Sequence, residues 1–142
     1  MKLHLIKLCV GCDSISDLAD WQKKRAAQRK KQGGSGDIMH ITRHTPKRAE
    51  ELLAGGSIYW VIKGQIAVRQ QLKGFKQVTR EGVPHCAIVL DKTLVPTERR
   101  SYRAFQGWRY FTAKDAPRDL KKSDKAALPE ALHAELTNLG LI

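Results

Sequence analysis

The sequence predicts an α+β domain: a small antiparallel sheet, curled or closed into a partial β-barrel, with helices packed at its ends. Two observations predict this fold class: the order of the elements and the short connections between the later strands. A strand, a helix and a second strand are followed by another helix and then by several strands in a row. Strands that follow one another over short connections pair antiparallel, whereas a parallel pair needs a long crossover. With 142 residues, 42% of them hydrophobic, the chain has the length of one ordinary domain, and we expect a single domain over residues 1–142.

The first part of the chain contains a strand, a long helix and another strand. Residues 3–8 are apolar on both faces, which indicates a buried strand. Residues 11–14 form a turn that supplies an N-cap for a helix running to about Lys31. Glycines dominate residues 32–36, which predict a flexible loop, and the alternation over residues 37–43 predicts a strand. The weak apolar stripe of the helix consists of Ile15, Leu18, Ala19, Gln22 and Ala26, with Trp21 at its edge.

The middle of the chain predicts a short helix and a hairpin. Thr45 is a good N-cap and Pro46 suits the first helical position, where its missing N–H costs nothing. Gly55 and Gly56 end that helix, and the β-branched and aromatic residues 58–62 form a strand. A turn at Lys63-Gly64 leads into a second strand over residues 66–72.

The remainder of the chain predicts short strands and irregular segments. Residues 73–82 form a short segment between two glycine turns, and residues 86–90 form a buried strand. A brief strand follows at residues 94–95. We expect residues 97–119 to be irregular except for a strand near residues 108–111, and Pro129 to begin a closing helix.

Net charge is the strongest compositional signal. The chain has 26 Lys and Arg against 14 Asp and Glu, a formal net charge of +12, which attracts phosphate backbones. The N-terminus lacks the features of a secretory signal, and no segment is apolar for the roughly 20 residues that a membrane span needs. An odd number of cysteines fits a reducing compartment. We therefore expect a cytoplasmic protein that has nucleic acid, RNA more than DNA, as its partner, and no membrane association.

A basic and aromatic segment gives the most specific hypothesis about a site. Between residues 99 and 110, arginines alternate with aromatic side chains, the combination that single-stranded nucleic acids require for phosphate contact and base stacking. The same rings are equally suited to a core, and the arginines to internal pairing with Asp115 and Asp119. We expect Trp108 to be buried and this segment to fold against residues 42–71. The predicted nucleic-acid contacts are Arg43, His44, Tyr59, Lys63, Arg69, Arg99, Arg100, Arg103, Gln106 and Arg109.

Two other functions fit the same sequence. A small enzyme or a reader of modified bases would have a pocket near His44, Tyr59 and Arg109. A ribosome-associated accessory domain would dock through the helix end at residues 23–31, where six of nine residues are basic. That helix end is a second candidate for phosphate contact, although a solvated basic face serves solubility alone. No residue pattern predicts a catalytic group.

Cysteine spacing gives a weak metal signal. Cys9 and Cys12 have the separation of a ligand pair, and His85 with Cys86 could complete a zinc set. Both pairs adjoin apolar strands, and cysteine is among the most buried residue types. We expect buried thiols, no metal and no cofactor.

Three segments carry a family resemblance. They are LHLIKLCVG at the start, HITRHTPKRAEELLAGGSIYWVIKGQIAVRQ in the middle and RAFQGWRYFTAKDAPRDL near the end. With the closing LPEALHAELTNLGLI, they resemble the uncharacterised bacterial domain of unknown function 1489, a family that implies no activity. More distantly, the order of helix, glycine pair and basic strands is similar to PUA-like small barrels, the group that includes the ASCH and EVE domains, which implies binding of RNA or a modified base.

Overall fold

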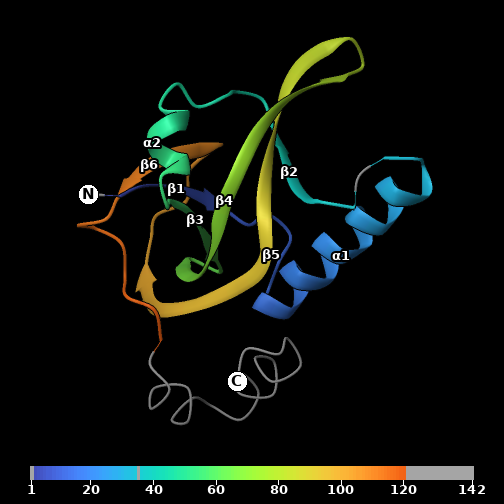
Figure 1. The fold of residues 1–142 in the computed structure, drawn as a ribbon. Helices are drawn as coiled ribbons and strands as arrows, with labels where there is room; N and C mark the ends of the chain where they lie inside the picture. The colour runs from blue at the N-terminus through green and yellow to red at the C-terminus, as the bar shows by residue number, and fades with distance from the viewer. Residues whose placement is uncertain (1, 35, 121–142) are drawn as a thin grey trace.

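The computed structural model describes residues 2–34 and 36–120. Strands and helices within them are arranged around one curled sheet (Figure 1). The helix predicted from Pro129 lies outside the described residues. In chain order the elements are β1 (Leu3–Leu8), α1 (Ile15–Lys31), β2 (Ile38–Thr42), α2 (Ala49–Leu53), β3 (Ser57–Ile62), β4 (Gln65–Arg80), β5 (Val83–Ser101) and β6 (Trp108–Thr112).

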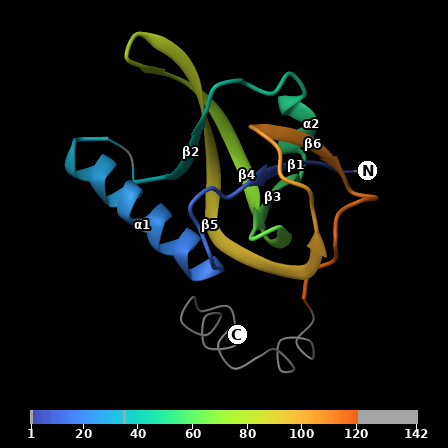
Figure 2. The ribbon, with the colours of Figure 1, turned by 180° about the vertical axis from the view of Figure 1, so that it is seen from behind.

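The six strands form one sheet in the order β2-β5-β4-β3-β1-β6. An α+β fold with a curled sheet is thereby confirmed, but the prediction of a purely antiparallel sheet is wrong, because β1 pairs parallel with β3. The connection between them contains α1, β2 and α2, which is long enough for a parallel crossover. Viewed from behind, the strands wrap around the core and α1 lies along one side (Figure 2).

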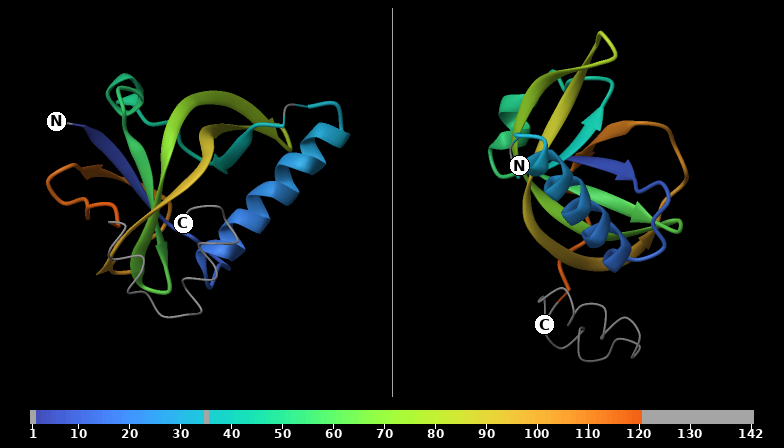
Figure 3. Two further views of the ribbon diagram at one scale, coloured as in Figure 1. Left: turned by 60° about the horizontal axis from the view of Figure 1, so that its bottom comes forward. Right: turned by 90° about the vertical axis from the view of Figure 1, so that its right-hand side faces the viewer.

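The longest feature is the β4–β5 hairpin, which projects beyond the rest of the sheet (Figures 1 and 3). Its turn has Glu81 at φ +51° and Gly82 at φ +78°, the conformation of a tight two-residue hairpin turn. The predicted short segments over 66–72, 73–82, 86–90 and 94–95 are therefore parts of two long strands. Register shifts near Leu72 and Gly74 bend β4 without ending it, and an expected irregular stretch from residue 97 is strand as far as Ser101.

Helix α1 follows the prediction closely. Ser14 is the N-cap, and its hydroxyl accepts a hydrogen bond of 3.1 Å from the Asp17 amide. Asp17 in turn accepts from the Asp13 amide at 2.9 Å, which satisfies a further backbone donor. The stripe predicted to face the core is the one that is buried: Ile15, Leu18, Ala19, Gln22 and Ala26.

Helix α2 begins later than its sequence indicates. Thr45 does not cap it; the N-cap position is Arg48, and no side chain bonds the helix amides there. Pro46 is buried instead, and the Arg48 amide donates to the Tyr110 hydroxyl at 3.2 Å. Contacts with β6 therefore override the local Thr-Pro signal and leave a helix of 5 residues.

Apolar side chains pack on both faces of the sheet. The larger cluster lies inside the curl, where Leu5, Trp60 and Ile88 meet Leu18 of α1. The smaller one lies on the other face, where Tyr59 and its neighbours are covered by the chain on either side of β6. Packing on both faces fixes the strands that carry the polar side chains described below.

The two edge strands approach each other without pairing. Trp108 in β6 donates from its indole Nε1 to the backbone oxygen of His44 at 3.0 Å, just after β2. The sheet of the described residues is thus strongly curled but not closed into a barrel by a continuous ladder. Trp108, which we expected to be buried, is half-buried and packs at the edge of the core.

Candidate nucleic-acid interface

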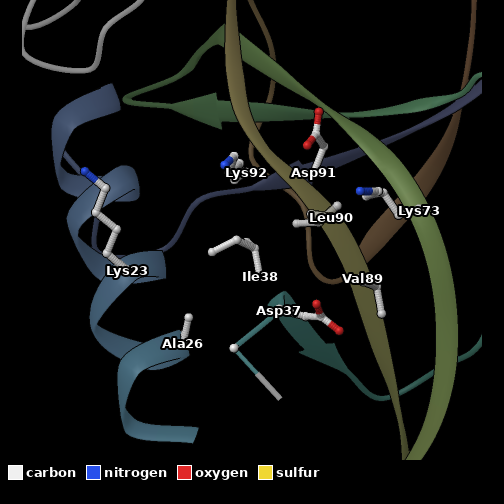
Figure 4. Close-up of a pocket in the computed structure, with 10 residues that line it drawn as sticks. Lys23, Ala26, Asp37, Ile38, Lys73, Val89, Leu90, Asp91 and Lys92 are labelled. Atoms are coloured by element: carbon white, nitrogen blue, oxygen red, sulfur yellow. The ribbon is translucent and has the colours of Figure 1, made fainter. Parts of the chain in front are cut away.

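A cleft of about 620 Å³ lies between α1 and the β4–β5 strands. In Figure 4, Lys23 stands on the helix wall, and Lys73 and Lys92 stand on the strand wall. All three lysines are exposed. Apolar side chains, among them Ile38 of β2, line the cleft between the walls.

The charges of this cleft are unevenly compensated. Asp37 and Asp91 also line it, and Asp37 forms an ion pair of 3.7 Å with Lys76 outside the cleft. None of Lys23, Lys73 and Lys92 makes an ion pair with another residue in the part of the chain that the structure describes. Three ammonium groups from three separate elements are thus available to an anion with spaced charges.

A buried amide network holds the helix wall against the strand wall. Gln22 of α1 and Gln70 of β4 exchange two hydrogen bonds of 2.9 and 2.8 Å. Gln70 also accepts from the Trp60 indole at 3.1 Å and donates to the Asp91 carbonyl at 2.7 Å. These bonds join α1, β3, β4 and β5, and they fix the spacing of the two walls.

Tyr59 and Arg69, two of the predicted contacts, face each other across β3 and β4 on the opposite face of the sheet. Arg69 binds both carboxylate oxygens of Asp119 at 2.7 Å and donates to the Ser57 hydroxyl at 3.0 Å. The pKa of the guanidinium is raised, because Asp119 stabilises its charged form. Tyr59 is 4% exposed. Because of these bonds to Asp119 and Ser57, the Arg69 guanidinium is largely occupied by internal partners.

A second cavity, of about 300 Å³, surrounds this pair. His4 lies in its wall, and its Nδ1 accepts a hydrogen bond of 2.9 Å from the Ser57 amide. The pKa of His4 is lowered by burial and by the charges of Arg69 and Lys2. Because His4 bonds the Ser57 backbone and the Ser57 hydroxyl accepts from Arg69, this arrangement is not a serine–histidine nucleophile pair.

The segment from Arg99 to Arg109 does fold against residues 42–71: Arg100 and Ser101 pair with Ile66 and Gln65 at the end of the β4–β5 ladder. Beyond β5, the Tyr102 amide donates to the Gly64 carbonyl at 2.9 Å. Its rings face the protein: Tyr102 packs edge-on against Phe105 and Phe111 at 5.4 and 6.1 Å. The Arg109 guanidinium lies 4.9 Å from the Phe105 ring centroid. Tyr102 and Phe105 are thus engaged in the smaller apolar cluster, whereas Trp108 packs against the larger one and Tyr110 is 37% exposed.

The other predicted contacts are spread over the surface. Arg100 donates to the backbone oxygen of Asp115, and Lys63 occupies a positive φ of +50° in the β3–β4 turn. The cavity that Tyr59 lines includes neither His44 nor Arg109. The remaining predicted residues that are exposed are Arg43, His44, Arg99, Arg103, Gln106 and Arg109.

Sequence reasoning identified one wall of the cleft and missed the other. Lys23 belongs to the basic helix end that was a candidate for phosphate contact. Lys73 and Lys92 carry no local signal, because one adjoins a glycine that indicates a turn and the other lies between two predicted strands. Only the bent β4–β5 pair brings them to the same cleft.

The cysteines are buried free thiols, and Cys9 lies beside Cys12. Burial raises the pKa of all three, and the hydrogen bond with Cys12 raises that of Cys9 further. His85, which the spacing offered as a partner of Cys86 in a zinc set, has its Nδ1 within 2.9 Å of the Val83 carbonyl. Within residues 2–34 and 36–120, no cluster of histidine, cysteine and acidic side chains has the geometry to hold a metal ion.

Comparison with known proteins identifies a family. The family model described as protein of unknown function (DUF1489) matches residues 5–142. The chain belongs to this family. The searches of curated proteins and of solved structures gave no match for this DUF1489 protein. Neither helix of its described residues has the length and apolar composition to cross a membrane.

Proposed function

We propose that this DUF1489 protein binds single-stranded nucleic acid, with RNA as the expected form, and that the phosphates lie along the cleft between α1 and the β4–β5 strands. One observation carries the proposal: Lys23, Lys73 and Lys92 surround one cleft, exposed and without ion pairs in the described part of the chain. Lysine recognises phosphate as a mobile point charge and contributes a salt-dependent affinity.

The shape of the surface favours an unpaired strand. A cleft with a partly apolar lining accommodates sugar and base edges between its cationic walls. Sequence-specific RNA recognition mostly targets single-stranded loops and ends, where bases are accessible. An RNA-binding role also agrees with the net charge of +12.

The Arg99–Arg109 segment offers a second surface for the same function. Arg103, Gln106 and Arg109 are exposed there and can reach phosphates, although the neighbouring rings Tyr102 and Phe105 pack inward.

Four other expectations from the sequence stay predictions. They are the likeness to PUA-like barrels, a small-molecule pocket, docking on the ribosome and a cytoplasmic location.

The test compares two triple variants that remove the same charge. One replaces Lys23, Lys73 and Lys92 by alanine, and the other replaces Arg99, Arg103 and Arg109 by alanine. Binding of a labelled single-stranded RNA of mixed sequence is measured by fluorescence anisotropy, with the matching DNA strand and an RNA duplex as competitors. We expect the lysine variant to weaken binding by about tenfold or more and the arginine variant by less.

Other outcomes would reject the proposal. Equal losses in both variants would mean that only net charge matters. A larger loss in the arginine variant would locate the site on the Arg99–Arg109 segment. Failure of the wild-type protein to bind any of the nucleic acids would refute the function itself.

A further inference from the structure

A third cavity lies on the other flank of α1. Its volume is about 270 Å³, and it is bounded by α1, the end of β1 and two strands of the sheet. Trp21 and Lys23 are two residues apart, hence about 200° apart around the helix, so this cavity and the lysine cleft lie on opposite sides of α1. The residues that line it are Lys7, Leu8, Cys9, Val10, Trp21, His40 and Trp60.

Three rings from three elements form its walls. The His40 ring lies edge-on to Trp60, with centroids 5.2 Å apart and an interplanar angle of 83°. Trp21 is tilted against His40 at 6.1 Å. The Arg25 guanidinium covers the Trp21 ring at 4.2 Å from its centroid. Such an arrangement suits a flat ligand, because base-on-aromatic stacking needs ring faces and edges held in place.

The charges in and around the cavity define the ligand further. Lys7 is half-buried, and burial lowers the pKa of its ammonium group. His40 has its pKa lowered to about 4, mainly by burial, so its imidazole is neutral near pH 7. With Lys7 in the wall and Arg25 on Trp21, a cationic ligand would be repelled. A flat, uncharged ring with a carbonyl acceptor is the complementary chemistry.

We propose that this cavity binds one unpaired keto-bearing nucleobase, uracil, cytosine or guanine in preference to adenine, stacked against Trp21 with its carbonyl oxygen accepting from Lys7. The inference rests on the proposed function and extends it from phosphate contact to base recognition. A strand that passes from the lysine cleft to this cavity crosses the outer side of α1, which carries the exposed Lys24. The basic run of α1, larger than helix capping needs, thus contacts the connecting phosphates.

Free nucleosides test the cavity separately from the cleft. Uridine, cytidine, guanosine and adenosine, which carry no phosphate, are titrated while tryptophan fluorescence is recorded, since Trp21 and Trp60 both line the cavity. We expect saturable quenching by the three keto nucleosides and weaker binding of adenosine. Trp21→Ala should weaken uridine binding by about tenfold or more through lost stacking. Lys7→Met, which keeps an unbranched side chain, should weaken it by about tenfold and remove the discrimination against adenosine.

Controls distinguish a loss of binding that is caused by unfolding from one that is caused by the loss of a cavity side chain. Tyr110→Ala removes an aromatic ring that is 37% exposed outside the cavity and should leave uridine binding unchanged. Circular dichroism and thermal unfolding show whether each variant is folded. If Trp21→Ala does not fold, Trp21→Leu serves in its place, because it keeps apolar volume and removes the stacking ring.

The two proposals, phosphate binding in the cleft and base binding in the cavity, can be refuted independently. If the lysine triple variant loses RNA affinity while nucleosides do not bind and Trp21→Ala leaves RNA affinity unchanged, the cavity is not a base site and the proposed function stands. If nucleosides bind with the expected order while the lysine triple variant binds RNA normally, the proposed cleft is wrong and the base site stands. Equal binding of all four nucleosides, unaffected by Lys7→Met, would overturn the keto selectivity.

Discussion

Gln70 is fully buried in β4 and uses both amide hydrogens and both lone pairs of its side-chain oxygen. Its partners belong to α1, β3 and β5, so it links the helix that carries Lys23 to the strands that carry Lys73 and Lys92. Sequence patterning placed Gln22 on the buried stripe of the helix, but it could not reveal that a second glutamine 48 residues away is its partner.

Replacing Gln70 by leucine should destabilise the protein strongly. The substitution leaves the Gln22 amide, the Trp60 indole N–H and the Asp91 carbonyl without this partner, at about 1–3 kcal/mol for each buried group that stays unpaired. Urea unfolding measures the change in free energy. Gln71→Leu, at the exposed neighbouring position, is the control and should change it by about 0.5 kcal/mol or less. Similar stabilities for the two variants would contradict the network.

His40 should make stability depend on pH. Burial, followed by the positive charges of Lys7 and Arg25, lowers its pKa to about 4 in the folded protein, against about 6.5 in an unfolded chain. Above pH about 6.5, the pKa in the unfolded chain, His40 is neutral in both states and its stabilising contribution is fully present. As pH falls toward 4, His40 binds a proton in the unfolded chain but not in the folded one, and up to about 3 kcal/mol of the free energy of unfolding is lost.

The measurement is urea unfolding at about pH 7.5 and about pH 4.5. His40→Phe should show a smaller loss of stability at the lower pH than the wild type. A residual loss is expected, because the pKa of His4 is lowered in the same direction. His44→Asn, at an exposed position, should retain the wild-type loss. An unchanged pH dependence in His40→Phe would refute the assignment.

At the scale of elements, the junction between α2 and β3 depends on Gly56. Its amide donates to Leu52 at 2.9 Å and its carbonyl accepts from Leu72 at 3.0 Å. A Cβ on Gly56 would overlap the backbone oxygens of Leu3 and Leu52, which cannot move without disturbing β1 and α2. Here a glycine that looks like a simple helix stop is required by close backbone approach.

Gly56→Ala should therefore cost about 3 kcal/mol or more in the free energy of unfolding, the upper end of the cost of overpacking. Gly74 offers a matched control, because a Cβ there meets nothing within 4 Å. Gly74→Ala should be neutral or slightly stabilising, since alanine has the lower backbone entropy in the unfolded chain. Thermal and urea unfolding of both variants give the comparison, and a Gly56→Ala protein of wild-type stability would contradict the described packing.

Comparison of the predicted and observed elements shows which of them local residue patterns specify. The cap and buried stripe of α1 were predicted correctly because a helix is specified by neighbouring residues. β4 and β5 were divided wrongly into the segments 66–72, 73–82, 86–90 and 94–95, because a bent and bulged strand tolerates residues that usually mark turns. The parallel β1–β3 pair and the late start of α2 depend on tertiary contacts, which no local pattern contains.

The same distinction applies to the site. The basic end of α1 was recognisable as a charge run, whereas the strand lysines join it only through the curl of the sheet. The Arg and aromatic segment was the strongest sequence signal for nucleic acid, yet two of its rings, Tyr102 and Phe105, cover the smaller apolar cluster. An alternation of arginine and aromatic residues is equally typical of a strand and loop that close over a sheet, so composition alone cannot separate the two uses.

At the scale of the whole molecule, a net charge of +12 attracts any polyanion. What distinguishes a defined interface is how many phosphates a particular surface engages. For single strands, log K falls with log salt at a slope of about −0.7 for each phosphate neutralised. Three lysines in the α1–β4–β5 cleft thus account for about −2 of the total slope.

This slope, measured with the same single-stranded RNA over a range of salt concentrations, tests whether the strand lies in the cleft beside α1. We expect that replacing Lys23, Lys73 and Lys92 by alanine makes the slope less steep by about 2, while replacing Arg99, Arg103 and Arg109 changes it by less. A lysine variant with the wild-type slope, or an arginine variant with the larger change, would contradict the claim that the strand lies in the cleft beside α1.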